Sequence, residues 1–174
     1  MSAEEIYNLL KEKFGDSIIL MDSETPTEPI ISANPLKIND ISEFLRDAEE
    51  LQFDSLMNLS GVDDNNKKTI KNEDGTETTE NGTLSVYYHL YSTVLKHKIT
   101  LKVSTDRENP EVESVTNIWA AGNWNEREAY DMFGIKFLNH PDLRRILMPD
   151  DWDGYPLLKD YENPEFYEGM KIPY

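Results

Sequence analysis

Four charged side chains in one short stretch, Glu126, Arg127, Glu128 and Asp131, have the types and spacing that could do chemistry. Two carboxylates that flank a substrate can act as general acid and general base. Glu126 and Glu128 would lie on one helical turn, however, and nothing in the pattern gives them different roles. Two other interpretations stay open: an exposed ion-pair cluster with Arg127 and Asp131 paired at i,i+4, and charges that meet a partner protein.

The other polar candidates are histidines and a pair of arginines. His89, His97 and His140 match no metal-ligand spacing. His140 precedes a proline, which favours an extended backbone, and a structural or interface role is expected for it rather than catalysis. Arg144 and Arg145 could bind carboxylates in forks or hold a phosphate, but one basic dipeptide is too little for nucleic acid.

Aromatic residues follow these arginines. Trp152 and Tyr155 flank a turn, where they could anchor an interface or pack the turn against the core. The sequence has no Gly-rich phosphate loop, no nucleophile elbow and no dinucleotide fingerprint. From residue patterns alone, no active site stands out.

Composition narrows the function classes. The chain of 174 residues has no cysteine and a net charge of −17. Without cysteine it forms no disulfide and holds no thiolate-bound zinc or cysteine-ligated iron–sulfur cluster. The acidic field opposes binding to nucleic acid and to anionic lipid surfaces. The N-terminus is charged and amphipathic, unlike a signal peptide, so we expect the chain to stay in the compartment where it is made.

Hydrophobic periodicity predicts the elements that would position these residues. Ser2 and Glu5 form a capping box, and Gly15 ends the helix that follows. Asp40 precedes a second amphipathic helix, and Asn123 or Asn125 caps a third, which Gly134 ends. A further short helix is predicted over 113–121, and strands are predicted over 17–21, 29–33, 53–62, 83–92 and 96–103.

These elements indicate an α+β domain of two layers. Helices would pack on a mainly antiparallel or mixed five-stranded sheet in the order α-β-β-α-β-β-β, followed by a short helix and an extended C-terminal tail. We predict an α+β domain over 1–122, a helix and docking segment over 123–161 and a tail over 162–174. The polar segment 63–82 is expected to be a mobile, exposed loop or an extended hairpin without chemistry.

The segment from Trp124 to Tyr161 closely resembles the signature of one protein family, the C component of NADH-quinone oxidoreductase, which is the 30-kDa subunit of respiratory complex I. The resemblance rests on residues that stand in register over this whole segment: Glu126, Arg127, Glu128, Asp131, Met132, Phe133, Gly134, Ile135, His140, Pro141, Leu143, Arg144, Arg145, Ile146, Leu147, Trp152, Gly154, Pro156, Leu157, Lys159, Asp160 and Tyr161. The α+β pattern upstream is also similar to the family's domain.

The resemblance implies a cofactor-free subunit in the peripheral arm of a proton-translocating enzyme. The complex passes electrons from NADH through FMN and Fe–S clusters in partner subunits to quinone. The main contact would be the D component, here called the 49-kDa subunit. Nearby would lie the subunit with the terminal Fe–S cluster, together with other peripheral-arm subunits. Association with the cytoplasmic side of the bacterial inner membrane would be peripheral and indirect.

Under the resemblance, the charged and aromatic residues become partner-docking residues rather than catalysts. They are Glu126, Arg127, Glu128, Asp131, His140, Arg144, Arg145, Trp152, Tyr155, Lys159, Asp160 and Tyr161. Three alternatives remain: the equivalent subunit of a membrane-bound hydrogenase or ferredoxin-dependent complex, a stand-alone hydrolase that uses Glu126 and Glu128, and an acidic binding module unrelated to respiration.

Overall fold

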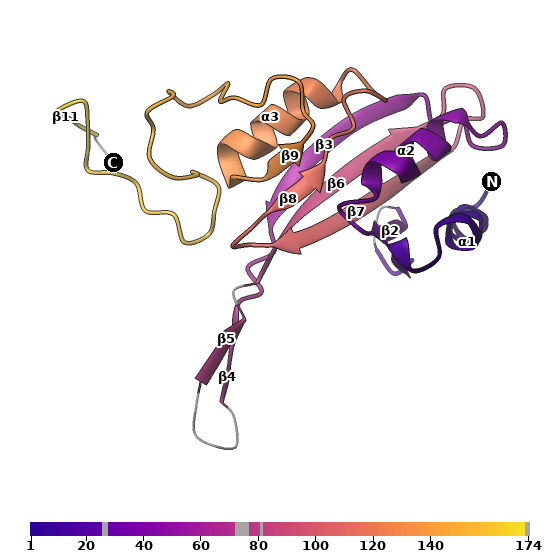
Figure 1. The fold of residues 1–174 in the computed structure, drawn as a ribbon, viewed down its shortest axis with the longest axis horizontal. Coiled ribbons are helices and arrows are strands. Elements are labelled where there is room, and N and C mark those ends of the chain that lie inside the picture. Colours follow the sequence, from indigo (N-terminus) through magenta and orange to yellow (C-terminus); the bar gives the residue numbers. More distant parts are fainter. Residues whose placement is uncertain (26–27, 72–76, 81, 173–174) are drawn as a thin grey trace.

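A computed structural model describes residues 1–25, 28–71, 77–80 and 82–172 of the chain (Figure 1). Three α-helices occur in this part, α1 (Ala3–Phe14), α2 (Ile38–Asp47) and α3 (Gly122–Phe133), and a 3-10 turn, η1 (Gly15–Ser17), follows α1. The strands are β1 (Ile18–Asp22), β2 (Ile30–Ala33), β3 (Ser55–Asp63), β4 (Lys68–Lys71), β5 (Glu77–Glu80), β6 (Thr83–Tyr91), β7 (Lys98–Asp106), β8 (Glu111–Glu113), β9 (Lys136–Leu138), β10 (Phe166–Tyr167) and β11 (Met170–Lys171).

Five strands form the central sheet, in the order β1-β2-β7-β6-β3. β2 and β7 pair in parallel, and the other neighbours pair antiparallel, so the sheet is mixed, as predicted. Every second residue of β6, from Leu84 to Leu90, is buried and joins one hydrophobic cluster with residues of all three helices. The helices therefore cover the same face of the sheet, and the prediction of a two-layer α+β domain is confirmed.

The helix ends predicted from the sequence are correct for α1 and wrong for the start of α2. Ser2 and Glu5 form the predicted capping box of α1, and Gly15 ends this helix with a φ of 54°. The start predicted for the second helix, after Asp40, is wrong, because α2 begins at Ile38 and already includes Asp40. Ile38 is fully buried, and its burial extends the helix toward the N-terminus, while Asp40 pairs with Lys37 across 3.0 Å on the surface.

The helix predicted over 113–121 is also wrong. Glu111–Glu113 forms β8, which pairs in parallel with β9, and turns then lead into α3. α3 begins at Gly122 without a side-chain cap, so neither Asn123 nor Asn125 caps it, whereas Gly134 ends it in the left-handed conformation, as predicted. The pairing with β9 is a contact distant in sequence, and helical periodicity does not report such contacts.

The polar segment 63–82 contains the extended hairpin that was one of its two predicted forms. β4 and β5 pair from Lys68↔Glu80 to Lys71↔Glu77, and the hairpin projects away from the main sheet (Figure 1). The prediction of an exposed segment is wrong at its first residue, because Asp63 is the last residue of β3 and is buried.

The C-terminal segment lies outside the central sheet and ends in the two-stranded hairpin β10–β11 (Figure 1). Residues 139–161, here called the strap, contain neither helix nor strand. The strap contacts the domain through its backbone: the N–H of Leu157 donates to the carbonyl of Met132, at 3.0 Å, near the end of α3. The division of the chain at 122 and 161 remains a prediction.

Candidate functional site

One carboxylate at the end of α3 organises the strap. The side chain of Asp131 is fully buried, and its Oδ2 accepts hydrogen bonds from three successive backbone N–H groups. The donors are Ile146, Leu147 and Met148, at 2.9, 2.7 and 3.0 Å. Successive backbone N–H groups that converge in this way form a concave anion site, here filled by the chain's own carboxylate.

Arg145 completes this anchor from within the strap. Its Nη1 pairs with Oδ1 of Asp131 at 2.9 Å, and its Nη2 donates to the carbonyls of Trp152 and Gly154, at 3.1 and 2.9 Å. The guanidinium also lies 5.2 Å from the centre of the Tyr155 ring. One side chain thus joins α3 to two parts of the strap, and we call the Asp131–Arg145 arrangement the α3 anchor.

The α3 anchor is an ion pair at neutral pH. Burial raises the pKa of Asp131, but the backbone N–H groups of 146–148 and the guanidinium of Arg145 outweigh burial, so the pKa lies below its ordinary value. Removing one partner of such a buried pair leaves the other charge uncompensated. Asp131 and Arg145 therefore depend on each other.

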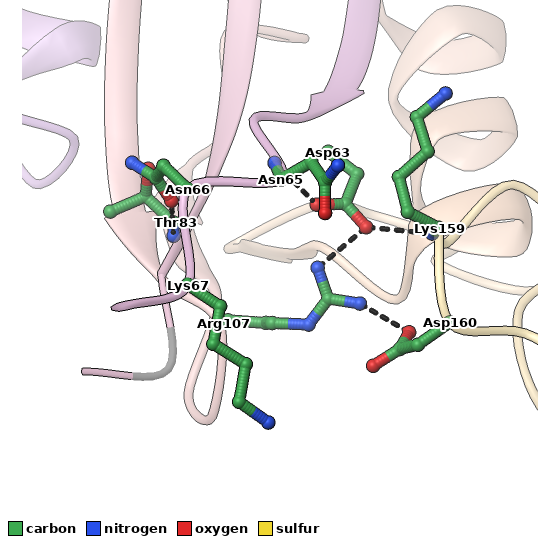
Figure 2. Close-up of a pocket in the computed structure, with 8 residues that line it drawn as sticks. All are labelled: Asp63, Asn65, Asn66, Lys67, Thr83, Arg107, Lys159 and Asp160. Atoms are coloured by element: carbon green, nitrogen blue, oxygen red, sulfur yellow. Dashed lines mark hydrogen bonds and ion pairs between the residues drawn. The ribbon is translucent and has the colours of Figure 1, made fainter. Parts of the chain in front are cut away.

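A second anchor holds the strap at the root of the β4–β5 hairpin (Figure 2). Oδ2 of Asp63 accepts from Nη1 of Arg107 at 2.5 Å and from the backbone N–H of Lys159 at 2.8 Å. Arg107 also pairs with Asp160. Burial raises the pKa of Asp63. The hydrogen bonds from Arg107 and from the N–H groups of Lys159 and Asn65 have the opposite and larger effect, so the pKa of Asp63 lies below its ordinary value.

The pocket beside this second anchor offers little to a ligand. Its volume is about 150 Å³, and its central cation, Arg107, is already occupied by two carboxylates. The ammonium ends of Lys67 and Lys159 point away from Arg107 (Figure 2). The arrangement fixes the chain rather than forming a charged binding site.

Glu126 is a buried carboxylate with a different environment. It is fully buried; its Oε1 accepts from the N–H of Val115 and its Oε2 from the hydroxyl of Ser114, both at 2.7 Å. Burial raises the pKa of Glu126 to about 7, although both hydrogen bonds act in the opposite direction. The nearby Tyr88 hydroxyl is buried with no partner among the described residues. Glu126 thus ties the turn after β8 to α3.

These positions decide between the interpretations of the charged stretch. An exposed ion-pair cluster is wrong for Glu126 and Asp131, because both are buried. The predicted Arg127–Asp131 pair is replaced by Arg145–Asp131, while Arg127 lies over the Trp124 ring, 4.9 Å from its centre. An acid–base pair of Glu126 with Glu128 has no support, since both oxygens of the buried Glu126 are occupied.

The remaining predicted residues lie along the strap. Nδ1 of His140 accepts from the N–H of Asp142 at 3.0 Å, so its Nε2–H donates to the carbonyl of Asn123 at 3.2 Å. Trp152 donates its indole N–H to the Tyr161 hydroxyl at 2.9 Å. Arg144 forms an exposed ion pair with Asp142. His140, Arg144, Trp152 and Tyr161 thus each have a partner within the strap or α3.

Sequence reasoning missed Asp63 and Arg107. Asp63 opens a polar segment, and Arg107 follows β7 with no motif around it. Their importance comes from the contact with Lys159, 96 residues from Asp63, which no local signal reports. In the described part of the chain, no cluster of three His, Cys, Asp or Glu residues could hold a metal ion. None of the helices described is both long and apolar enough to cross a membrane.

Comparison with known proteins gives one consistent family. Residues 31–167 match the family described as respiratory-chain NADH dehydrogenase, 30 Kd subunit. The C subunit of NADH-quinone oxidoreductase from Chloroherpeton thalassium is 43% identical over 98% of the chain and 65% of its own length. The protein of the same name from Chlorobium phaeobacteroides is 39% identical over 97% and 93%. A Bacteroides fragilis protein named as the C/D subunit of this enzyme is 42% identical over 79% of the chain and 25% of its own length.

Solved structures share the fold. A trypsin-resistant fragment of Nqo5 aligns with a TM-score of 0.57 at 22% identity, over 78% of this chain and 97% of that one. One polypeptide of an archaeal membrane-bound sulfane sulfur reductase aligns with a TM-score of 0.65 at 23% identity, over 91% and 85%. At these identities the likeness concerns the fold alone.

Proposed function

The chain belongs to the family of the 30-kDa subunit of respiratory-chain NADH dehydrogenase, and from this premise we propose that it helps to hold the peripheral arm together by docking on the 49-kDa subunit. In this role it is the C component of NADH-quinone oxidoreductase, and it carries no electrons itself. Electrons from NADH pass through FMN and Fe–S clusters of partner subunits to quinone. The absence of cysteine supports this division, because the chain has no thiolate to ligate a cluster.

The observation that carries the proposal is the C/D relative. Its name joins the C and D components, and the part that this chain matches is only a quarter of its length. A single polypeptide keeps its two parts close together, so a lasting contact with the 49-kDa subunit is expected where the two are separate chains. The subunit with the terminal Fe–S cluster would lie nearby with other peripheral-arm subunits. The complex would hold the chain at the cytoplasmic side of the inner membrane.

The strap fits this role physically. Residues 139–161 contain neither helix nor strand, and hydrogen bonds to the two buried aspartates, Asp63 and Asp131, fix their path. A segment held in one conformation loses less entropy when it binds a partner. The family's charged signature residues would thus act mainly by ordering the docking surface, while Glu128 and Arg144 remain exposed for direct contact.

The alternative is the equivalent subunit of a membrane-bound hydrogenase or ferredoxin-dependent complex. The likeness of fold to the archaeal reductase is compatible with it. The two complexes differ in the electron donor, which a partner subunit would bind in either case.

Deletion and complementation test the proposal. Membranes of the source organism that lack this chain should lose NADH:quinone oxidoreduction, and the chain supplied from a plasmid should restore it. The chain purified alone should not oxidise NADH. Turnover by the single chain, or full NADH:quinone activity without it, would contradict the proposal; loss of a ferredoxin-dependent activity instead would favour the alternative.

A further inference from the structure

A groove runs between the outer edge of the sheet and α3, and the chain does not fill it. β3 is the last strand of the sheet, and among the described residues only β6 pairs with it. The groove has a volume of about 370 Å³. Its lining combines an apolar floor from α3 and the strap with a polar rim from β3 and α3: Ala129, Met132, Phe133, Leu157, Asn58, Ser60, Asn125 and Glu128.

The packing of α3 on β3 keeps this groove open beside the free edge. Gly61 lets the Phe133 ring approach so closely that a Cβ at this position would lie 2.7 Å from it. The strap crosses one end, where the backbone of Leu157 bonds to Met132, but the Leu157 side chain remains 51% exposed. Leu157 is therefore the part of the apolar lining that is accessible from solvent, whereas Ala129 and Met132 are buried, with 2% and 8% exposure.

The features of this groove suit an extended peptide. An edge strand with unpaired backbone groups is a template for an added strand, and apolar side chains beside it provide pockets for alternate residues of the incoming segment.

Glu128 indicates the charge of the occupant. It is the one acidic residue of the Glu126–Asp131 stretch that is exposed, and the described residues offer it no ion pair. Arg127, its neighbour, turns toward Trp124 and the Arg144 carbonyl instead. A basic side chain opposite Glu128 would complement the groove.

We infer that this groove receives an extended segment of the 49-kDa subunit, which adds as a strand to β3 and places a Lys or Arg opposite Glu128. The inference rests on the proposed function. It is supported by the strap, which contributes Leu157 to the groove lining. A surface that includes the strap belongs to the face through which the chain would dock.

Photo-crosslinking in the assembled complex tests the inference. A benzophenone amino acid replaces Asn58 on the groove rim, and the matched control replaces Asn8, an exposed residue of α1. After irradiation, mass spectrometry should identify a crosslink from position 58 to a segment of the 49-kDa subunit, with none from position 8. Crosslinks from position 58 only to other subunits, or none at all in a complex that contains the 49-kDa subunit, would overturn the inference while leaving the proposed function intact. A complex that lacks the 49-kDa subunit would overturn both.

Charge reversal provides a second, independent test. Glu128→Lys should lower the recovery of the 49-kDa subunit with the tagged chain about tenfold, because attraction becomes repulsion. Glu12→Lys, at another exposed helical glutamate, should not change it. Thermal unfolding of the purified variants shows whether both are folded. Full recovery of the 49-kDa subunit with a folded Glu128→Lys chain would contradict the inference.

Discussion

Replacing Asp131 by asparagine should release the strap. The change removes the charge that neutralises Arg145, and one amide oxygen cannot serve both the guanidinium and the three N–H groups of 146–148. Loss of one partner of a buried ion pair costs about 3–5 kcal/mol. Arg145 is 12% exposed and keeps three carbonyl acceptors, so we expect the lower end, about 3 kcal/mol.

Hydrogen exchange measures this loss where it occurs. A local destabilisation of about 3 kcal/mol accelerates exchange of the 146–148 amides roughly 100-fold. Asp142→Asn is the matched control: it makes the same chemical change in the same segment, but its pair with Arg144 is exposed and screened by solvent, so its loss should leave exchange of the 146–148 amides nearly unchanged.

The pH dependence has a defined sign. The pKa of Asp131 is lowered in the folded chain, so the stabilisation of the fold by ionised Asp131 is present above the ordinary pKa of 3.8 and is lost as the pH falls below it.

Equal acceleration of amide exchange at 146–148 in the Asp131→Asn and Asp142→Asn chains, or no acceleration in the Asp131→Asn chain, would refute the assignment of Asp131 as the anchor.

Three further changes have expected outcomes. Burial raises the pKa of Glu126 to about 7, so protonated Glu126 stabilises the folded chain fully below the unfolded pKa, and the free energy of unfolding declines by about 3 kcal/mol as the pH rises through 7. Urea unfolding of Glu126→Gln should lack this decline. Parallel pH profiles of the wild-type and variant chains would contradict the prediction. Gly134→Ala should cost about 2 kcal/mol of unfolding free energy, because φ is 78° and the new Cβ would meet the Tyr155 ring at 2.6 Å; an unchanged melting temperature would count against this packing. Asp63→Asn leaves Arg107 without its buried partner, so hydrogen exchange should become faster at the Lys159 amide but not at the amides of 146–148. Faster exchange at Lys159 and also at 146–148 would mean that the two anchors are not independent.

The fold could be predicted where local patterns determine it. The Ser2–Glu5 capping box, Gly15 and Gly134 mark helix ends through backbone chemistry that acts within a few residues. The alternation from Leu84 to Leu90 identifies the buried face of β6, because one face of the sheet meets the helices.

The prediction failed where partners distant in sequence decide the structure. The stretch after Glu111 pairs with β9 rather than forming a helix. Asp131 takes Arg145 as its partner because three N–H groups beside Arg145 converge on the same carboxylate, and this outweighs the i,i+4 contact with Arg127. The role of Asp63 depends on a contact across 96 residues, which the polar composition of its segment conceals.

Recovery of the 49-kDa subunit with this chain tests the central claim most directly. The tagged chain is isolated from gently solubilised membranes of its own organism, and subunits are quantified by mass spectrometry. The 49-kDa subunit should be recovered in equal amount with the wild-type chain and with Asp142→Asn, and should be strongly reduced with Asp131→Asn, in which the strap is released. Wild-type chain recovered without the 49-kDa subunit, or full recovery of that partner with a demonstrably released strap, would contradict the claim that the anchored strap docks the chain.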